Sequence, residues 1–229
     1  MRLLAFETAT HHLSVALWQD GALLQRSEVL PNSGGERLLP WVQELLAEAS
    51  ICLQQLDGIA FGAGPGGFTG LRLACGVTQG LAFGLGIPVV PVSTLQAMAL
   101  ASGESFVWSC LDARMNEIYS ASYTVTGDVV SEIIAPMCAS YGVSPAPTGM
   151  GCVGIGDGFA SYGDGLCARK PDMLRVRADV YPSAAAVARI AAPVLARGDG
   201  IHASAAQPIY VRDKVAMTTA ERLARGGIK

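Results

Sequence analysis

Five glycines and one proline lie between two apolar runs in the stretch FGAGPGGFTGLRL, residues 61–73, and constrain the fold more than any other segment. A strand pattern precedes the stretch and a helical pattern follows it. Glycine-rich loops in this setting often bind phosphate at the N-terminus of the helix. Gly62, Gly64 and Gly67 also fit the spacing G-x-G-x-x-G, so the stretch raises the question of a nucleotide site.

Two details argue against a dinucleotide site in this loop. The loop does not follow the first strand of the chain, and residues 87–101 contain no acidic side chain to bind a ribose. A P-loop is excluded because no Lys-Ser/Thr pair follows the glycines. Two interpretations stay open. The loop is a tight turn that needs glycine for close backbone approach, or Gly64, Gly66 and Gly67 contact a phosphate or a partner.

The order of elements in the first hundred residues predicts the fold class. Apolar runs and helical spacing indicate strand, strand, strand, helix, strand, helix, strand, helix. The expected strands are residues 3–6, 13–18, 22–29, 58–61 and 87–92, and the expected helices are 36–49, 68–84 and one that starts at 93. This is the order of the ribonuclease-H-like unit that also builds actin-like proteins. We therefore expect an α/β, actin-like fold with two similar lobes.

A polar, glycine-containing break at residues 101–106 predicts a boundary between two lobes. We expect a first lobe of residues 1–102 and a second lobe of 103–229, with the tail free to pack back on the first. The second lobe is expected to contain strands at 106–113, 117–125 and 128–135, a long surface loop at 136–151 and an alanine-rich helix at 182–197. The tail 221–229 is expected to fray.

Composition excludes several classes of protein. The net charge of −3 gives no broad attraction for nucleic acid, so tight autonomous RNA binding is not expected. Six scattered cysteines without a C-x-x-C pair predict reduced thiols and a cytoplasmic protein. The most apolar stretch, residues 71–90, contains Arg72, four glycines and a proline, so no membrane span is predicted.

Three further glycines recur at every fourth position of the helix expected at 68–84. Gly76, Gly80 and Gly84 lie on one face, and each costs about 1 kcal/mol of helix propensity relative to alanine. Such a cost suggests a compensating contact. Either the helix lies closely on the sheet of its own lobe, or the glycine face meets a helix of another subunit.

Polar side chains in two turns are candidates for ligand contact. Thr8 and Thr10 lie between the first two strands, where they could contact phosphate or simply cap the turn. Asp112, Arg114 and Glu117 lie in a charged turn that is either a solvated hairpin tip or a contact with a partner or ligand.

The sequence predicts no catalytic residue and no metal ligand. His11 and His12 are neighbours, and on a strand they would face opposite ways, which disfavours joint chelation of a metal. No histidine is placed to activate a serine or cysteine as a nucleophile.

The order and spacing of several stretches resemble one family, the bacterial TsaB (YeaZ) proteins. The stretches are LLAFETATHHLSVAL, ERLLPWVQELL, the glycine loop with its following helix, LDARMNEIYSASY and PIYVRDKVA. The resemblance covers most of the chain and departs most at residues 136–165. It implies an actin-like fold and a role in making threonylcarbamoyladenosine beside the tRNA anticodon.

The resemblance further implies a non-catalytic relative of TsaD. By that alignment Thr94 and Met98 stand where the catalytic relative has its metal-binding histidines, and neither replaces a histidine as a ligand here. The implied role is to bind and activate a TsaD-like catalytic subunit together with a TsaE-like ATPase. Contact with tRNA would be indirect, no cofactor would be bound firmly, and the interface of the complex would be a place for ATP or ADP to bind.

The implied partner surface consists of the two helices expected at 36–49 and 68–84. Its residues are Leu38, Leu39, Val42, Leu45, Arg72, Leu73, Gly76, Gly80 and Gly84. The same surface would form a homodimer when the partner is absent.

Two enzymatic alternatives stay open. One is a stand-alone peptidase or hydrolase of the glycoprotease superfamily. The other is an actin-like kinase, for which residues 154–165 are the only candidate for a second phosphate loop.

Overall fold

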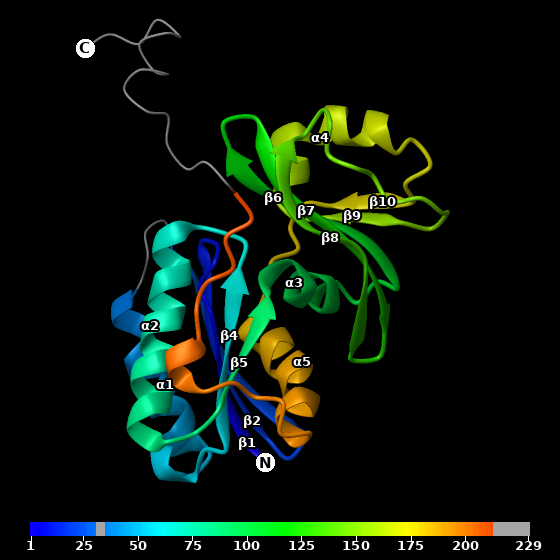
Figure 1. Cartoon of the computed structure of the whole chain (residues 1–229). Coiled ribbons are helices and arrows are strands. Elements are labelled where there is room, and N and C mark those ends of the chain that lie inside the picture. Colours follow the sequence, from blue (N-terminus) through cyan, green and yellow to red (C-terminus); the bar gives the residue numbers. More distant parts are fainter. Residues whose placement is uncertain (31–34, 213–229) are drawn as a thin grey trace, which may run out of the picture.

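Two lobes, each built on a five-stranded sheet, make up the computed structural model, which describes residues 1–30 and 35–212 (Figure 1). The strand order is β3-β2-β1-β4-β5 in the first sheet and β10-β9-β6-β7-β8 in the second. Both sheets carry helices, so the predicted α/β class is confirmed. The tail at 221–229, which was expected to fray, lies outside the described residues.

The first sheet begins with the predicted antiparallel meander. Strands β1 (Arg2–Glu7), β2 (His12–Gln19) and β3 (Ala22–Val29) pair in sequence order. Strand β4 (Gly58–Gly64) pairs parallel with β1, and β5 (Val89–Ser93) pairs parallel with β4. Every residue of β4 is buried, as expected for a central parallel strand covered on both faces.

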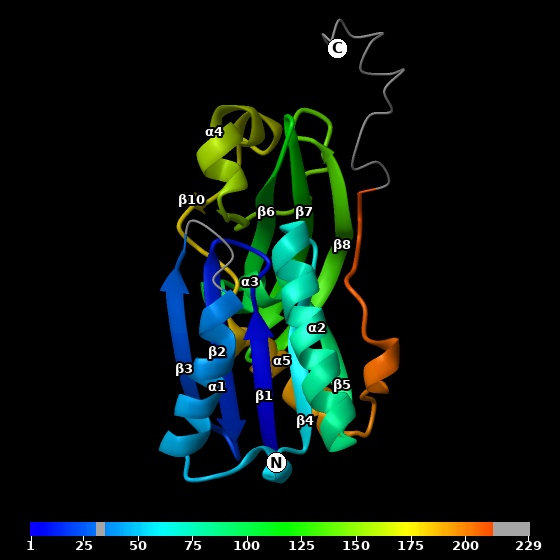
Figure 2. The same ribbon diagram turned by 90° about the vertical axis from the view of Figure 1, so that its left-hand side faces the viewer.

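Two helices cover one face of this sheet (Figure 2). Helix α1 (Gly35–Glu48) presents an apolar stripe at helical spacing, with Leu38, Trp41, Val42, Leu45 and Leu46 buried. Helix α2 (Phe68–Leu85) buries Leu71, Ala74, Cys75, Thr78 and Ala82, and ends at Gly86 with a left-handed φ of 66°. A short helix, η1 (Leu53–Gln55), leads into β4.

The opposite face is covered by α3 (Thr94–Ser102) and α5 (Ala184–Ala196). The Ser93 and Ser183 side chains cap these helices by accepting hydrogen bonds from the backbone. Helix α5 packs against β1 and β2 through a face dominated by alanine, and small side chains let a helix approach a sheet closely. Helix α5 was expected in the second lobe, residues 103–229, but it packs on the sheet of the first lobe.

The second lobe consists of a second meander, two short strands and one helix. Its elements are β6 (Phe106–Arg114), β7 (Glu117–Thr126), β8 (Val129–Ser140), β9 (Val153–Ile155), α4 (Gly158–Arg169) and β10 (Arg175–Arg177). Trp108 of β6 packs edge-on against Phe159 of α4. Leu95 and Met98 of α3 pack in an apolar cluster with residues of the second sheet, so α3 lies between the lobes.

The surface loop predicted for residues 136–151 is wrong at its start. Strand β8 continues through Pro136 to Ser140. It can include Pro136 because β8 is an edge strand and its pairing with β7 contains register shifts. A proline is tolerated at an edge or a bulge since its missing N–H breaks no essential ladder bond there. Strands β9 and β10 were not predicted, and each is only three residues long.

We predict that Ala188→Leu destabilises the protein by roughly 1–3 kcal/mol, because the fully buried Ala188 has no room for extra methylenes. Equilibrium unfolding in urea measures the change. Ala196→Leu, at the exposed end of the same helix, is the matched control and should stay within about 0.5 kcal/mol of wild type. Equal effects of the two substitutions would contradict close packing of α5.

Candidate functional site

A cavity of about 460 Å³ lies between the two lobes. Its walls are the β1–β2 turn, the glycine loop with the first turn of α2, the β6–β7 hairpin, the start of α4 and residues 209–212. Among the residues predicted to contact phosphate, Thr8, Thr10, Gly66 and Gly67 line the cavity. Gly64 does not belong to the lining.

The β1–β2 turn and the glycine loop touch backbone to backbone. The Gly67 N–H donates to the Ala9 carbonyl at 2.7 Å, and the Thr8 hydroxyl donates to the Gly70 carbonyl at 2.7 Å. A Cβ atom at Gly66 would collide with Ala9, and one at Gly70 would collide with Thr8. The structure thus gives these glycines the close-approach role that was one of the two interpretations of the loop.

The Thr10 hydroxyl also has a structural partner, because it accepts a hydrogen bond from the His12 N–H at 3.1 Å. The expectation that His11 and His12 face opposite ways assumed that both lie on a strand, and this condition is not met. His11 lies in the turn before β2 begins, the two rings are 4.6 Å apart, and Tyr181 stacks on His12 at 3.6 Å.

A buried carboxylate connects the turn to the loop. Glu7 is fully buried and accepts hydrogen bonds from the Ala9 N–H at 2.7 Å and the Thr94 hydroxyl at 3.3 Å. Thr94 in turn accepts from the Gly64 N–H at 3.2 Å, and Gly62 leaves room for the carboxylate because a Cβ there would collide with it. Burial raises the pKa of Glu7 to about 7. Sequence reasoning missed this residue, although its acidic side chain interrupts an apolar strand.

The wall contributed by the second lobe carries two carboxylates. Asp112 accepts hydrogen bonds from the Arg114 N–H at 2.7 Å and from the Tyr162 hydroxyl at 3.2 Å. Asp157 accepts from the Asp112 N–H at 2.9 Å, and burial raises the pKa of Asp157. The charged turn is therefore tied to α4, and its carboxylates are already engaged by groups of the protein.

A segment after α5 crosses from one lobe to the other beside the cavity. Beyond the short helix η2 (Ala203–Ala205), residues 206–212, here called the strap, run along α2 and end at the β6–β7 hairpin (Figure 1). The Gln79 side chain donates to the Ala206 carbonyl at 2.8 Å, and the Ile209 N–H donates to the Ala63 carbonyl at 2.7 Å. Arg212 Nε donates to the Glu117 carboxylate at 2.9 Å. Sequence reasoning placed residues 208–212 in a stretch that resembles the family, but it gave none of them a place in a site.

The glycine stripe of α2 faces away from the sheet. Gly76, Gly80 and Gly84 are exposed, and a Cβ placed at any of them would meet nothing within 4 Å. The alternative in which these glycines let α2 lie closely on its own sheet is therefore wrong. Leu39 of α1 is also exposed, at 51%.

Part of the predicted partner surface needs correction. Leu38, Val42 and Leu45 are at most 3% exposed and belong to the apolar core between α1 and the sheet. Their side chains cannot contact a partner of the folded lobe. Leu39, the half-buried Leu73 and Arg72 remain accessible beside the glycine stripe.

The two positions that the resemblance aligned with metal ligands are in the core. Thr94 and Met98 are both fully buried, and a Cβ at Gly156 would lie 2.9 Å from the Met98 methyl group. Within residues 1–30 and 35–212, no group of three or more His, Cys, Asp or Glu side chains is arranged to hold a metal ion. Among the same residues, no helix has the length and apolar character needed to cross a membrane.

Comparisons with known proteins agree with this two-lobed α/β architecture, which is that of the actin-like group. The family model described as TsaD, tRNA N6-adenosine threonylcarbamoyltransferase, matches residues 32–144. The tRNA threonylcarbamoyladenosine biosynthesis protein TsaB of Escherichia coli is 33% identical over 94% of this chain and 96% of its own length. The chain belongs to the TsaB (YeaZ) family.

A solved structure supports the same assignment. YeaZ from Pseudomonas aeruginosa is 36% identical to this chain, with a TM-score of 0.85 over 91% of this chain and 99% of that one. TsaB of Haemophilus influenzae is 45% identical over 52% of each chain. The predicted family and actin-like fold are confirmed.

We predict opposite effects of alanine at two glycines of α2. Gly70→Ala should destabilise the protein by about 2 kcal/mol or more, because the new Cβ would collide with the Thr8 carbonyl. Gly76→Ala should stabilise it by roughly 0.5–1 kcal/mol, because the site is open and alanine favours a helix. Urea unfolding of both variants at low protein concentration measures the difference. A stabilised Gly70→Ala variant would contradict the turn–loop contact.

We predict that Glu7 makes stability fall as pH rises. The pKa of Glu7 is about 7 in the folded protein and 4.5 for an ordinary glutamate, so the native state binds the extra proton between these values. The stabilisation is fully present below about pH 4.5 and is lost by about pH 7. The free energy of unfolding should fall by between about 2 and 3 kcal/mol from pH 5 to pH 8, relative to Glu7→Gln.

Glu36→Gln, which changes an exposed glutamate of α1, is the control for this pH series. Parallel stability curves for wild type and Glu7→Gln would show that Glu7 does not carry the effect.

Proposed function

We propose that this chain is a non-catalytic, cytoplasmic partner protein in the synthesis of threonylcarbamoyladenosine in tRNA. The proposal is supported by its family, whose named members are tRNA threonylcarbamoyladenosine biosynthesis proteins. In this role the chain would support transfer of the threonylcarbamoyl group to N6 of the adenosine beside the anticodon. It would act by binding and activating a TsaD-like catalytic subunit together with a TsaE-like ATPase.

The single observation that carries the partner role is the open glycine face of α2. Three exposed glycines in one helix cost about 3 kcal/mol of helix propensity, and nothing inside the described chain compensates for them. A helix of another subunit could approach the backbone closely along this face. The proposed surface consists of the exposed side of α2, with Arg72, Leu73 and the glycines, and the neighbouring Leu39 of α1.

The polar groups around the glycine loop fit a protein without catalytic activity of its own. The hydroxyls of Thr8 and Thr10 and the carboxylates of Asp112 and Asp157 are bonded to groups of the protein itself. A nucleotide, if the complex uses one, would then bind at the interface with the partner. Thr8, Thr10, Gly66 and Gly67 are the cavity residues nearest to such a role, and Gly64 would act only through the loop backbone.

Net charge argues for indirect contact with tRNA. The chain carries −3 overall, so it offers no broad electrostatic attraction for the phosphate backbone. The catalytic subunit would supply most of the tRNA-binding surface. In the absence of that subunit, the same glycine face would let two copies of this chain associate.

Reconstitution of the modification tests this function. The reaction contains tRNA, threonine, bicarbonate, ATP and the partner enzymes of the same organism, with and without this chain, and mass spectrometry quantifies the modified nucleoside. Product should require this chain, while the chain alone should produce none. Equal product without the chain would refute the proposal and return attention to hydrolase and kinase assays.

We predict that Gly80→Leu weakens the complex at least tenfold, about 1.4 kcal/mol, because the new side chain blocks close approach of the partner helix. The fold should survive, since a Cβ at Gly80 meets no atom of the chain. Binding to the catalytic subunit by calorimetry and unfolding in urea measure the two effects separately. Ala160→Leu, at an exposed position of α4 in the other lobe, is the control and should bind normally.

Unchanged affinity and elution volume of Gly80→Leu would show that the glycine face is not the interface. Wild-type reconstitution could then still succeed through another surface.

A further inference from the structure

The two lobes are held together differently on their two sides. On one side, the β7–β8 hairpin lies against the first lobe, and Val125 and Val130 pack on the apolar cluster beneath α5. The Gln96 side chain of α3 donates to the Val130 carbonyl at 3.2 Å. Arg189 of α5 pairs with Asp128 at the tip of the hairpin. This side combines apolar packing with polar contacts, so it is the fixed side of the lobe junction.

The cavity lies on the other side, where the strap crosses between the lobes. Its attachment to the first lobe is extensive. Besides the bonds from Gln79 and to Ala63, the Tyr210 ring packs 5.5 Å from the Phe68 ring. The Arg72 guanidinium lies 3.7 Å from the centre of the Phe68 ring, and its Nε lies 3.4 Å from the Tyr210 hydroxyl oxygen.

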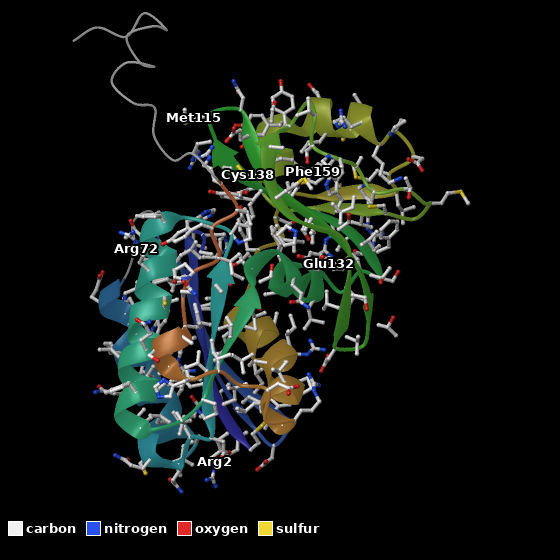
Figure 3. The ribbon with its side chains drawn as sticks, viewed as in Figure 1. Arg2, Arg72, Met115, Glu132, Cys138 and Phe159 are labelled. Atoms are coloured by element: carbon white, nitrogen blue, oxygen red, sulfur yellow. The ribbon has the colours of Figure 1, made fainter. Side chains whose placement is uncertain are left out.

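Among the residues that the structure describes, Arg212 makes the hydrogen bonds and the ion pair that join the strap to the second lobe. Arg212 pairs with Glu117 and donates a longer bond to the Arg114 carbonyl at 3.4 Å. The Arg212 guanidinium holds the pKa of Glu117 below its usual range. Because the Glu117 side chain is 38% exposed, water and salt weaken this ion pair. Figure 3 labels Arg72 and Cys138, which lie in the two lobes that the strap joins.

The strap also forms part of the cavity wall. Residues 209–212 line the cavity together with the β1–β2 turn, the glycine loop and the β6–β7 hairpin. Movement of the strap away from the hairpin would therefore widen the cavity without disturbing the packed side of the junction.

We propose that the strap is a releasable latch. In the closed state the Arg212–Glu117 pair holds the strap across the cavity. When the pair breaks, residues 209–212 leave the hairpin and the cavity opens, while the β7–β8 hairpin keeps the lobes together. This device goes beyond the proposed role as a partner protein and does not depend on it.

The chain contains a natural reporter for the other end of the strap. The Cys75 thiol of α2 is buried and donates to the Ala206 carbonyl at 3.5 Å. Ala206 is also held by Gln79. A latch that opens only at its Arg212 end leaves Cys75 covered, whereas unfolding of the lobe exposes the thiol.

Hydrogen exchange on the full chain without any partner tests the latch. In Arg212→Gln, the amides of the cavity-lining loops at residues 8–11 and 66–70 should exchange about fivefold faster or more than in wild type, while the Ile209 amide stays protected by its bond to Ala63 of the first lobe. Amides of α5 should keep their wild-type rates, and alkylation of Cys75 followed by mass spectrometry should stay slow. The double variant Arg212→Glu, Glu117→Arg should restore slow exchange by reversing the pair.

Arg197→Gln is the matched control, because Arg197 forms an exposed pair with Asp199 in the first lobe. It should leave all these rates unchanged. Wild-type exchange in Arg212→Gln would overturn the latch, and so would equal acceleration in α5 together with fast alkylation of Cys75. Neither result bears on the reconstitution assay, so the latch and the partner role fail separately.

Discussion

The first lobe depends on a helix that the chain supplies only after it has passed through the second lobe. Strands β1, β2 and β4 are buried on both faces, and α5 covers the face opposite α1 and α2. Without α5, the apolar side chains of Leu3, Ala5 and their neighbours would face water. The two lobes are therefore linked in folding, because the sheet of the first lobe is not covered on both faces until residues 184–196 have returned to it.

Regular patterns made the core of the fold predictable. The three strands of the first meander and the helices α1 and α2 match their expected ranges within a few residues, because alternating or helical apolar spacing marks each of them. The second half was less predictable. Pro136 made the last part of β8 look like a loop. Strands of three residues such as β9 are too short to show the alternation of apolar and polar residues that marks a strand. The return of α5 to the first sheet depends on tertiary packing that local sequence does not encode.

The candidate site was also predictable only in part. Glycines marked the loop, and hydroxyls marked the turn that lies beside it, so both were found from residue type alone. Helical spacing could identify Leu38 as part of an amphipathic helix, but it could not say that this side chain faces the sheet and Leu39 the solvent. Arg212 and Glu117 are 95 residues apart, and a pair of such separation leaves no local signal.

The contact between Thr8 and Gly70 has a consequence for how such a sequence can change over time. The two backbones are so close that a side chain at position 70 has nowhere to go unless the turn between β1 and β2 takes another path. Drift at one segment is thus conditional on drift at another that lies 62 positions away. The turn between β1 and β2 and the start of α2 must therefore be inherited as a matched pair.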